Sequence, residues 1–146
     1  MSRHGQVGTM IATMAHSPAV LAGYLDLSRA TKRAKLDRKL SERVSIAVQA
    51  RLGCRTCLDS HMEAAKGVGG SDDEIEVART ADSEDPRGAA LLRFATKVLT
   101  EPASLDDDDD LMGLLHHGYS EQEVVDVVGI VALNQLTGSF NLVAGL

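Results

Sequence analysis

Residues 42–61 read ERVSIAVQARLGCRTCLDSH, and this stretch contains four side chains that can take part in chemistry. Cys54 and Cys57 form a Cys-x-x-Cys pair. His61 follows the second cysteine by four residues, and Glu42 precedes the first by twelve. The stretch therefore holds both a dithiol and a candidate acid–base pair within a short length of chain.

The pattern of apolar residues around this stretch predicts two helices that form a hairpin. A helix is expected to begin after an N-cap at Asp37 and to end at Gly53, because glycine readily takes the left-handed conformation that ends a helix. A second helix is expected to begin near Cys54 and to stop in a group of glycines. The apolar positions of the first helix recur at helical spacing and are Leu40, Val44, Ala47, Val48 and Leu52; the glycines are Gly67, Gly69 and Gly70.

The rest of the chain carries similar helix signals, and no segment alternates like a half-exposed strand. The predicted helix starts are Ser17-Pro18, Ser71 with Glu74, Asp85-Pro86, Ser104-Leu105 and Ser120 with Glu123. The helix from residue 71 is expected to run to about Ala81, and Pro102 to close the one before residue 104. We predict an all-α, single-domain helical bundle of about six to seven helices over residues 16–146, preceded by a weakly ordered segment at residues 1–15.

Composition limits the classes of function. The chain has 146 residues, of which 44% are hydrophobic, 25% charged and 3% aromatic, so an aliphatic core in one domain is expected. A net charge of −6 argues against nucleic acid as the main partner. The sequence shows no uninterrupted apolar run of membrane-spanning length and no pattern of a secretory signal. We therefore expect no membrane partner and a cytoplasmic location.

The spacing of the four side chains suits thiol chemistry. A cysteine at a helix start is favoured as a thiolate by the helix dipole. His61 lies four residues after Cys57, so both are on one helix face and the imidazole can take or return a proton near neutral pH. Glu42 lies roughly 16 Å back from the turn and His61 roughly 10 Å forward, so a crossed hairpin brings them within reach, directly or through a water.

The order in which the cysteines react stays open at this level. The helix dipole favours Cys54 as the attacking thiolate, whereas His61 favours Cys57. We prefer Cys57, because a base within hydrogen-bond reach acts directly on the thiol proton.

The spacing Glu-x11-Cys-x-x-Cys-x3-His resembles the signature of the alkyl hydroperoxide reductase D-like (AhpD-like) branch of the carboxymuconolactone decarboxylase family. Further similarities are His16-Ser17-Pro18, Leu36-Asp37 and Gly118-Tyr119-Ser120. Some members carry His or Tyr between the cysteines, where this chain has Arg55-Thr56. The resemblance implies an all-α antioxidant peroxidase that forms trimers or hexamers. It also implies that Cys54 and Cys57 reduce hydroperoxides while Glu42 and His61 relay the proton.

A thiol peroxidase of this kind would take a hydroperoxide as substrate, would need a dithiol or protein reductant, and would use no cofactor. One alternative is decarboxylation of a lactone, after the name of the wider family. Another is a non-enzymatic redox sensor or metal-binding module. A zinc site normally has four protein ligands, whereas only Cys54, Cys57 and His61 are evident, so we expect no metal.

Overall fold

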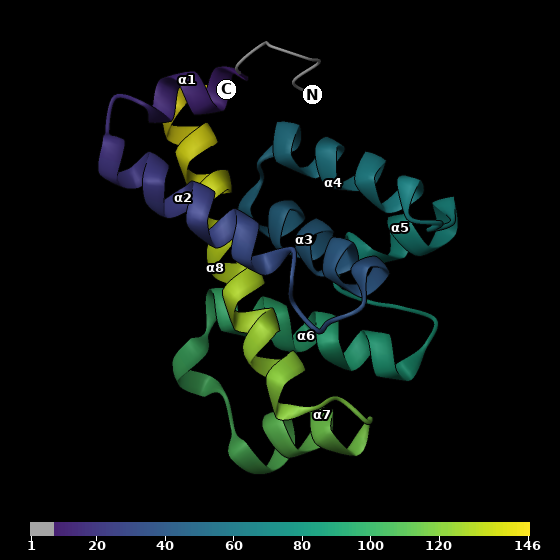
Figure 1. Ribbon diagram of the computed structural model, residues 1–146. Coiled ribbons are helices and arrows are strands. Elements are labelled where there is room, and N and C mark those ends of the chain that lie inside the picture. Colours follow the sequence, from purple (N-terminus) through teal and green to yellow (C-terminus); the bar gives the residue numbers. More distant parts are fainter. Residues whose placement is uncertain (1–7) are drawn as a thin grey trace.

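The computed structural model describes residues 8–146, except for the side chains of Asp107 and Asp108. Over this range it contains eight α-helices and no strand (Figure 1). Their bounds are α1 Thr9–Met14, α2 Pro18–Thr31, α3 Arg38–Leu52, α4 Arg55–Gly67, α5 Asp72–Ala78, α6 Pro86–Thr100, α7 Met112–His116 and α8 Glu121–Ala144. A 3₁₀ turn at Pro102–Ser104 and a π-helical turn at Asp107–Leu111 connect α6 to α7. The predicted all-α bundle is confirmed.

Most predicted helix starts are confirmed by their hydrogen bonds. Ser17 caps α2, Asp37 caps α3 and Asp85 caps α6, each through its side chain. Reciprocal capping boxes open α5 and α8. Each of these caps satisfies N–H groups that a helix start otherwise leaves unpaired.

Three details differ from the predicted elements. The start predicted at Ser104-Leu105 is wrong, because the Ser104 hydroxyl donates back to the carbonyl of Glu101 within the 3₁₀ turn, and α7 begins only at Met112. The helix that was expected to reach about Ala81 ends at Ala78, because the next residues form a turn in which Ala81 takes a positive φ of 56°. A short helix, α1, precedes α2 and buries Met14. Residues 1–7 of the segment expected to be weakly ordered lie outside the described residues.

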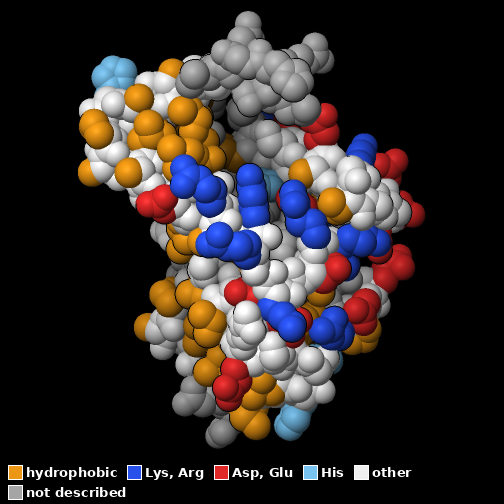
Figure 2. All heavy atoms as spheres, in the orientation of Figure 1, with side chains coloured by type: hydrophobic (Ala, Val, Ile, Leu, Met, Phe, Trp, Pro, Cys, Tyr) orange, Lys and Arg blue, Asp and Glu red, His pale blue; other side chains and the backbone are white. Residues whose placement is uncertain are grey.

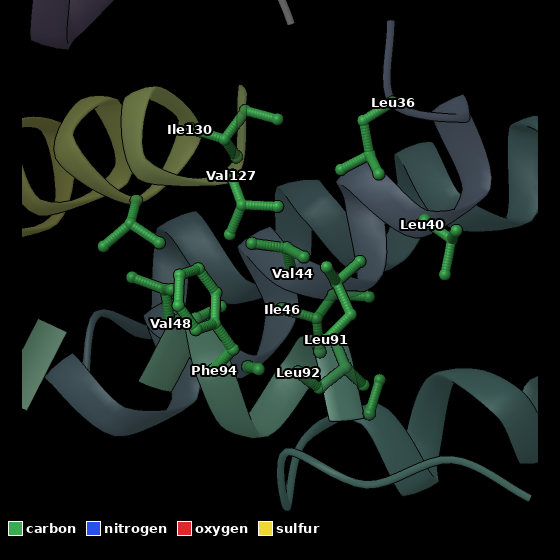
Figure 3. Close-up of a cluster of buried hydrophobic side chains, with 14 of the residues drawn as sticks. Leu36, Leu40, Val44, Ile46, Val48, Leu91, Leu92, Phe94, Val127 and Ile130 are labelled. Atoms are coloured by element: carbon green, nitrogen blue, oxygen red, sulfur yellow. The ribbon is translucent and has the colours of Figure 1, made fainter. Parts of the chain in front are cut away.

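α3 is the central helix, and it packs against α4, α5, α6 and α8. Its side chains Val44, Ile46 and Val48 are fully buried. Figure 3 shows these three close to Leu91 and Leu92 of α6 and Val127 of α8. A helix enclosed on several sides holds its side chains at defined positions, so α3 is a rigid support for any residue placed on it.

α8 is the one described helix that is long and apolar enough to cross a bilayer by length and composition alone. Core helices of soluble proteins meet the same criterion. Here α8 packs against α2, α3 and α6 (Figure 1). A third of its most apolar window is buried within the chain.

Candidate active site

The turn between α3 and α4 places the two cysteines at the start of α4 and lets Glu42 of α3 contact His61 of α4. Gly53 takes φ 81° and ends α3, and its N–H donates to the carbonyl of Gln49. Cys54 follows as the N-cap of α4. The helices fold back on one another as the predicted hairpin, and α4 packs along α3.

Cys54 and Cys57 form a disulfide, with their Cα atoms 5.4 Å apart. Cys54 is 1% exposed and Cys57 is 7% exposed, so a bulky reagent has little direct access to either residue. The N–H of Cys57 points toward the Sγ of Cys54 at 3.4 Å. The start of α4 thus supplies both an N–H donor and the positive end of a helix dipole to the first sulfur.

Glu42 and His61 contact each other directly. His61 Nδ1 lies 2.8 Å from Glu42 Oε2. Arg38 Nε donates to the other carboxylate oxygen at 3.0 Å. We assign the Nδ1 proton of His61 to this hydrogen bond, which leaves Nε2 of the neutral ring as an acceptor. In this tautomer His61 can act as a base.

Glu42 is ionised at neutral pH in this setting. Burial raises the pKa of its carboxyl group, but hydrogen bonds and charge interactions with His61 and Arg38 outweigh burial and leave the pKa below the ordinary value of 4.5. The buried carboxylate therefore keeps its negative charge beside the imidazole.

Asn141 of α8 also contacts the disulfide. Its Nδ2 donates to the Sγ of Cys57 at 3.3 Å, although the two residues are 84 positions apart in sequence. Asn141 is 6% exposed, and its Oδ1 has no hydrogen-bond partner among the described residues. This contact places a neutral donor on the second sulfur.

A cleft of about 490 Å³ opens beside Glu42 and His61. Glu42 and His61 line one part of it, and Lys32 and Arg38 line another. Its floor includes Asn134, which takes part in a buried hydrogen-bond network between α3 and α8. The cleft therefore offers an acid–base pair and space for a small organic ligand, and the two cysteines are not among the residues that line it.

The model of the carboxymuconolactone decarboxylase family matches residues 18–101, which is more than half of the chain. The chain belongs to this family. The matched range includes all four site residues predicted from the sequence, and the resemblance inferred from their spacing is confirmed.

Relatives of this family member are similar over most of its length. Protein YdfG of Bacillus subtilis is 27% identical over 110 residues, which cover 73% of this chain and 74% of YdfG. A peroxidase-related protein from Ralstonia eutropha with an AhpD core superposes with a TM-score of 0.81 at 21% identity, covering 90% of this chain and 71% of that one. The debrominase Bmp8 superposes with a TM-score of 0.80 at 21% identity, covering 97% and 77%. These likenesses confirm an AhpD-like fold.

Among the residues that the structure describes, the other three histidines, His16, His116 and His117, do not line the cleft. His16 contacts the carbonyl of Thr13 through Nδ1 at 2.9 Å, next to the start of α2. His116 ends α7 and His117 caps it. In the part of the chain that the structure describes, no group of three or more His, Cys, Asp or Glu side chains is arranged to hold a metal ion.

Sequence reasoning missed Asn141. A signal was available, because Asn134 and Asn141 are polar residues two turns apart on one face of a helix rich in Val, Ile and Leu. Both turn out to be buried. Only the packing of α8 on the hairpin shows that the second of them reaches a sulfur.

Proposed function

We propose that this chain is a thiol-dependent peroxidase that reduces hydroperoxides through a Cys54–Cys57 dithiol/disulfide cycle. The observation that carries the proposal is the 2.8 Å contact between Glu42 and His61 on the same hairpin as the disulfide. An acid–base pair of this kind has a clear use beside a thiol that must lose a proton before it attacks.

In the first step, Nε2 of His61 takes the proton of the Cys57 thiol. The ionised Glu42 stabilises the resulting imidazolium, and the Asn141 amide N–H donates to the thiolate. The thiolate attacks the terminal oxygen of the hydroperoxide, and the O–O bond breaks. The alkoxide that leaves takes the proton from His61, so the products are an alcohol and a Cys57 sulfenic acid.

In the second step, the sulfur of Cys54 attacks the sulfur of Cys57. The hydroxyl group leaves as water with the proton of Cys54, and the disulfide forms. A dithiol or protein reductant then supplies two electrons and two protons to restore both thiols. Because the disulfide must be reduced in every cycle, we also propose a cytoplasmic location, where thiols are kept reduced.

The decisive experiment measures consumption of hydrogen peroxide and cumene hydroperoxide with dihydrolipoamide or dithiothreitol as reductant. Many turnovers per chain are expected for the wild type, and none for the variant with Cys54→Ser and Cys57→Ser. One equivalent of peroxide consumed, with no recycling by either reductant, would indicate a redox sensor. Activity on a carboxymuconolactone that survives in the double variant would indicate the lyase.

A second electrophile belongs in the same assay, because the debrominase Bmp8 shares this fold and has been crystallised with 2,3,4-tribromopyrrole. Turnover of tribromopyrrole without turnover of any hydroperoxide would contradict the peroxidase proposal. The cycle would then be dithiol-driven removal of bromine.

Non-reducing gels and thiol counts test the disulfide step separately. Mild peroxide is expected to convert two free thiols per chain to none without linking chains covalently. A predominance of disulfide-linked dimers would contradict the cycle within one chain.

A further inference from the structure

Cationic side chains gather where α2 ends and α3 begins. Residues 29–38 hold five of the fifteen Lys and Arg residues in a chain whose net charge is −6. Figure 2 shows Lys and Arg side chains close together over this region of the surface. Such a cluster creates a local positive potential that attracts anions.

Only part of this cluster is neutralised by neighbouring acids. Arg29 pairs with Asp26, and Arg38 pairs with Glu42. The other three cations, which form no ion pair with any described residue, are Lys32, Arg33 and Lys35. Their charge is therefore available to a ligand.

Lys32 is the unpaired cation that lines the cleft beside His61. Arg38 lines it too, but its guanidinium already donates to Glu42. The cleft also has an apolar wall, to which Ile130 and Leu133 of α8 contribute. Its volume of about 490 Å³ lies within the range of pockets for small organic ligands.

We propose that the cleft selects organic hydroperoxides that carry a carboxylate. The apolar body of the substrate packs against Ile130 and Leu133, the carboxylate pairs with Lys32, and the peroxide lies toward His61. This inference rests on the proposed peroxidase function, and the chemical steps are those given above. Lys32 contributes to the choice of substrate and not to the breaking of the O–O bond.

The turnover test compares cumene hydroperoxide with its para-carboxylate, since the reacting group is the same in both. Wild-type kcat/KM is expected to be higher for the carboxylate at low ionic strength by a factor of up to about five, mainly through KM, as for one exposed ion pair. Lys32→Ala is expected to remove this preference by raising KM for the carboxylate. Lys66→Ala is the matched control, because it changes the net charge equally at the far end of α4, where Lys66 pairs with Asp72.

A binding test separates this inference from the peroxidase proposal. The probe is the unreactive alcohol 4-(2-hydroxypropan-2-yl)benzoate, titrated by calorimetry into the disulfide form of the wild type, of Lys32→Ala and of Lys66→Ala. Binding that is lost only in Lys32→Ala supports a carboxylate site in the cleft, even if no peroxide turns over.

Two results would overturn the inference. One is peroxide turnover with equal kcat/KM for the two substrates, together with no binding of the alcohol; the peroxidase proposal would then stand without this selectivity. The other is a Lys32→Ala variant that is slowed only when an acidic protein serves as reductant, since the cations would then bind the reductant.

Discussion

At the scale of single residues, replacing the Glu42 carboxylate is the most direct test of the proposed proton relay between Glu42 and His61. Glu42→Gln keeps the size and polarity of the side chain but removes the charge that stabilises the His61 imidazolium. Because acid–base assistance is worth about 10²–10⁴-fold, we expect single-turnover oxidation of the thiols near pH 7 to slow by a factor in this range. Raising the pH toward 8.5, the ordinary value for a free thiol, is expected to restore part of the rate.

His61→Ala supplies the matched comparison for the relay. It should slow single-turnover oxidation of the thiols by a similar factor. The double variant should be little slower than either single variant, because the effects of residues that act as a unit are not additive. A Glu42→Gln protein that is folded and reacts at the wild-type rate would show that the contact with His61 is only structural.

The same carboxylate makes folding stability depend on pH. The pKa of Glu42 is lower in the folded chain than its ordinary value of 4.5. Its ionised form therefore contributes stability that is fully present above pH 4.5 and is lost as the pH falls through the lower folded pKa. Urea unfolding of Glu42→Gln and wild type between pH 3 and 7 should give a difference in free energy that shrinks on the acid side. Glu63→Gln, on the exposed side of α4, is the control substitution. A pH-independent difference for Glu42→Gln would contradict this assignment.

Asn141 is expected to decide how readily Cys57 becomes a thiolate. A hydrogen bond to a charged acceptor contributes about 1.5 kcal/mol or more, so Asn141→Ala should slow the reaction with peroxide about tenfold at pH 7. The deficit should vanish near pH 10, where the thiolate forms unaided. A rate that is reduced equally at every pH would instead indicate damage to packing.

The relay pair could be predicted from the sequence, and Asn141 could not, for a physical reason. Glu42 and His61 lie on consecutive helices joined at Gly53, so helix geometry alone limits their separation. The position of Asn141 depends on how α8 crosses the hairpin. No local spacing rule connects residues that are 84 positions apart.

At the scale of helices, the crossing of α3 and α8 depends on Gly138. A Cβ atom there would lie 2.5 Å from Oε1 of Gln49 and 2.8 Å from Cδ1 of Leu52. Gln49 is fully buried and its amide donates to α8, so it has little freedom to move away. Gly138→Ala should therefore destabilise the fold by about 1–3 kcal/mol, as measured by urea unfolding.

Gly129 of the same helix is the natural control. A Cβ atom there would meet nothing within 4 Å, so Gly129→Ala should stabilise α8 by about 0.5–1 kcal/mol through helix propensity alone. Equal effects of the two substitutions would show that α8 does not rest on α3 at Gly138.

Helix starts were the most predictable elements, because a cap acts within three or four residues of itself. The early end of α5 was less predictable. It depends on the positive φ of Ala81. An alanine in a sequence gives no indication of this conformation, because residues other than glycine rarely adopt it.

At the scale of the whole molecule, α2 and α8 leave apolar side chains exposed. No residue of α2 is buried. On α8, Val125 is 69% exposed and Val143 is 90% exposed. We propose that these faces are covered in a homo-oligomer, a trimer or a multiple of one, as the family resemblance implies.

Light scattering tests this assembly. A mass of three or six chains is expected, and Val128→Glu on the exposed face of α8 should yield a folded species of lower mass. A stable wild-type monomer across the micromolar range would contradict the proposal.

The hairpin that carries the dithiol also has a consequence for the order in which the molecule folds. Glu42 and His61 are 19 residues apart, and the loop that brings them together is short. Short loops close with a small loss of chain entropy and therefore early, whereas contacts between distant residues form later. We expect Glu42 and His61 to meet while α8 is still free, so that a refolding chain forms this contact first and the contact between Asn141 and Cys57 last.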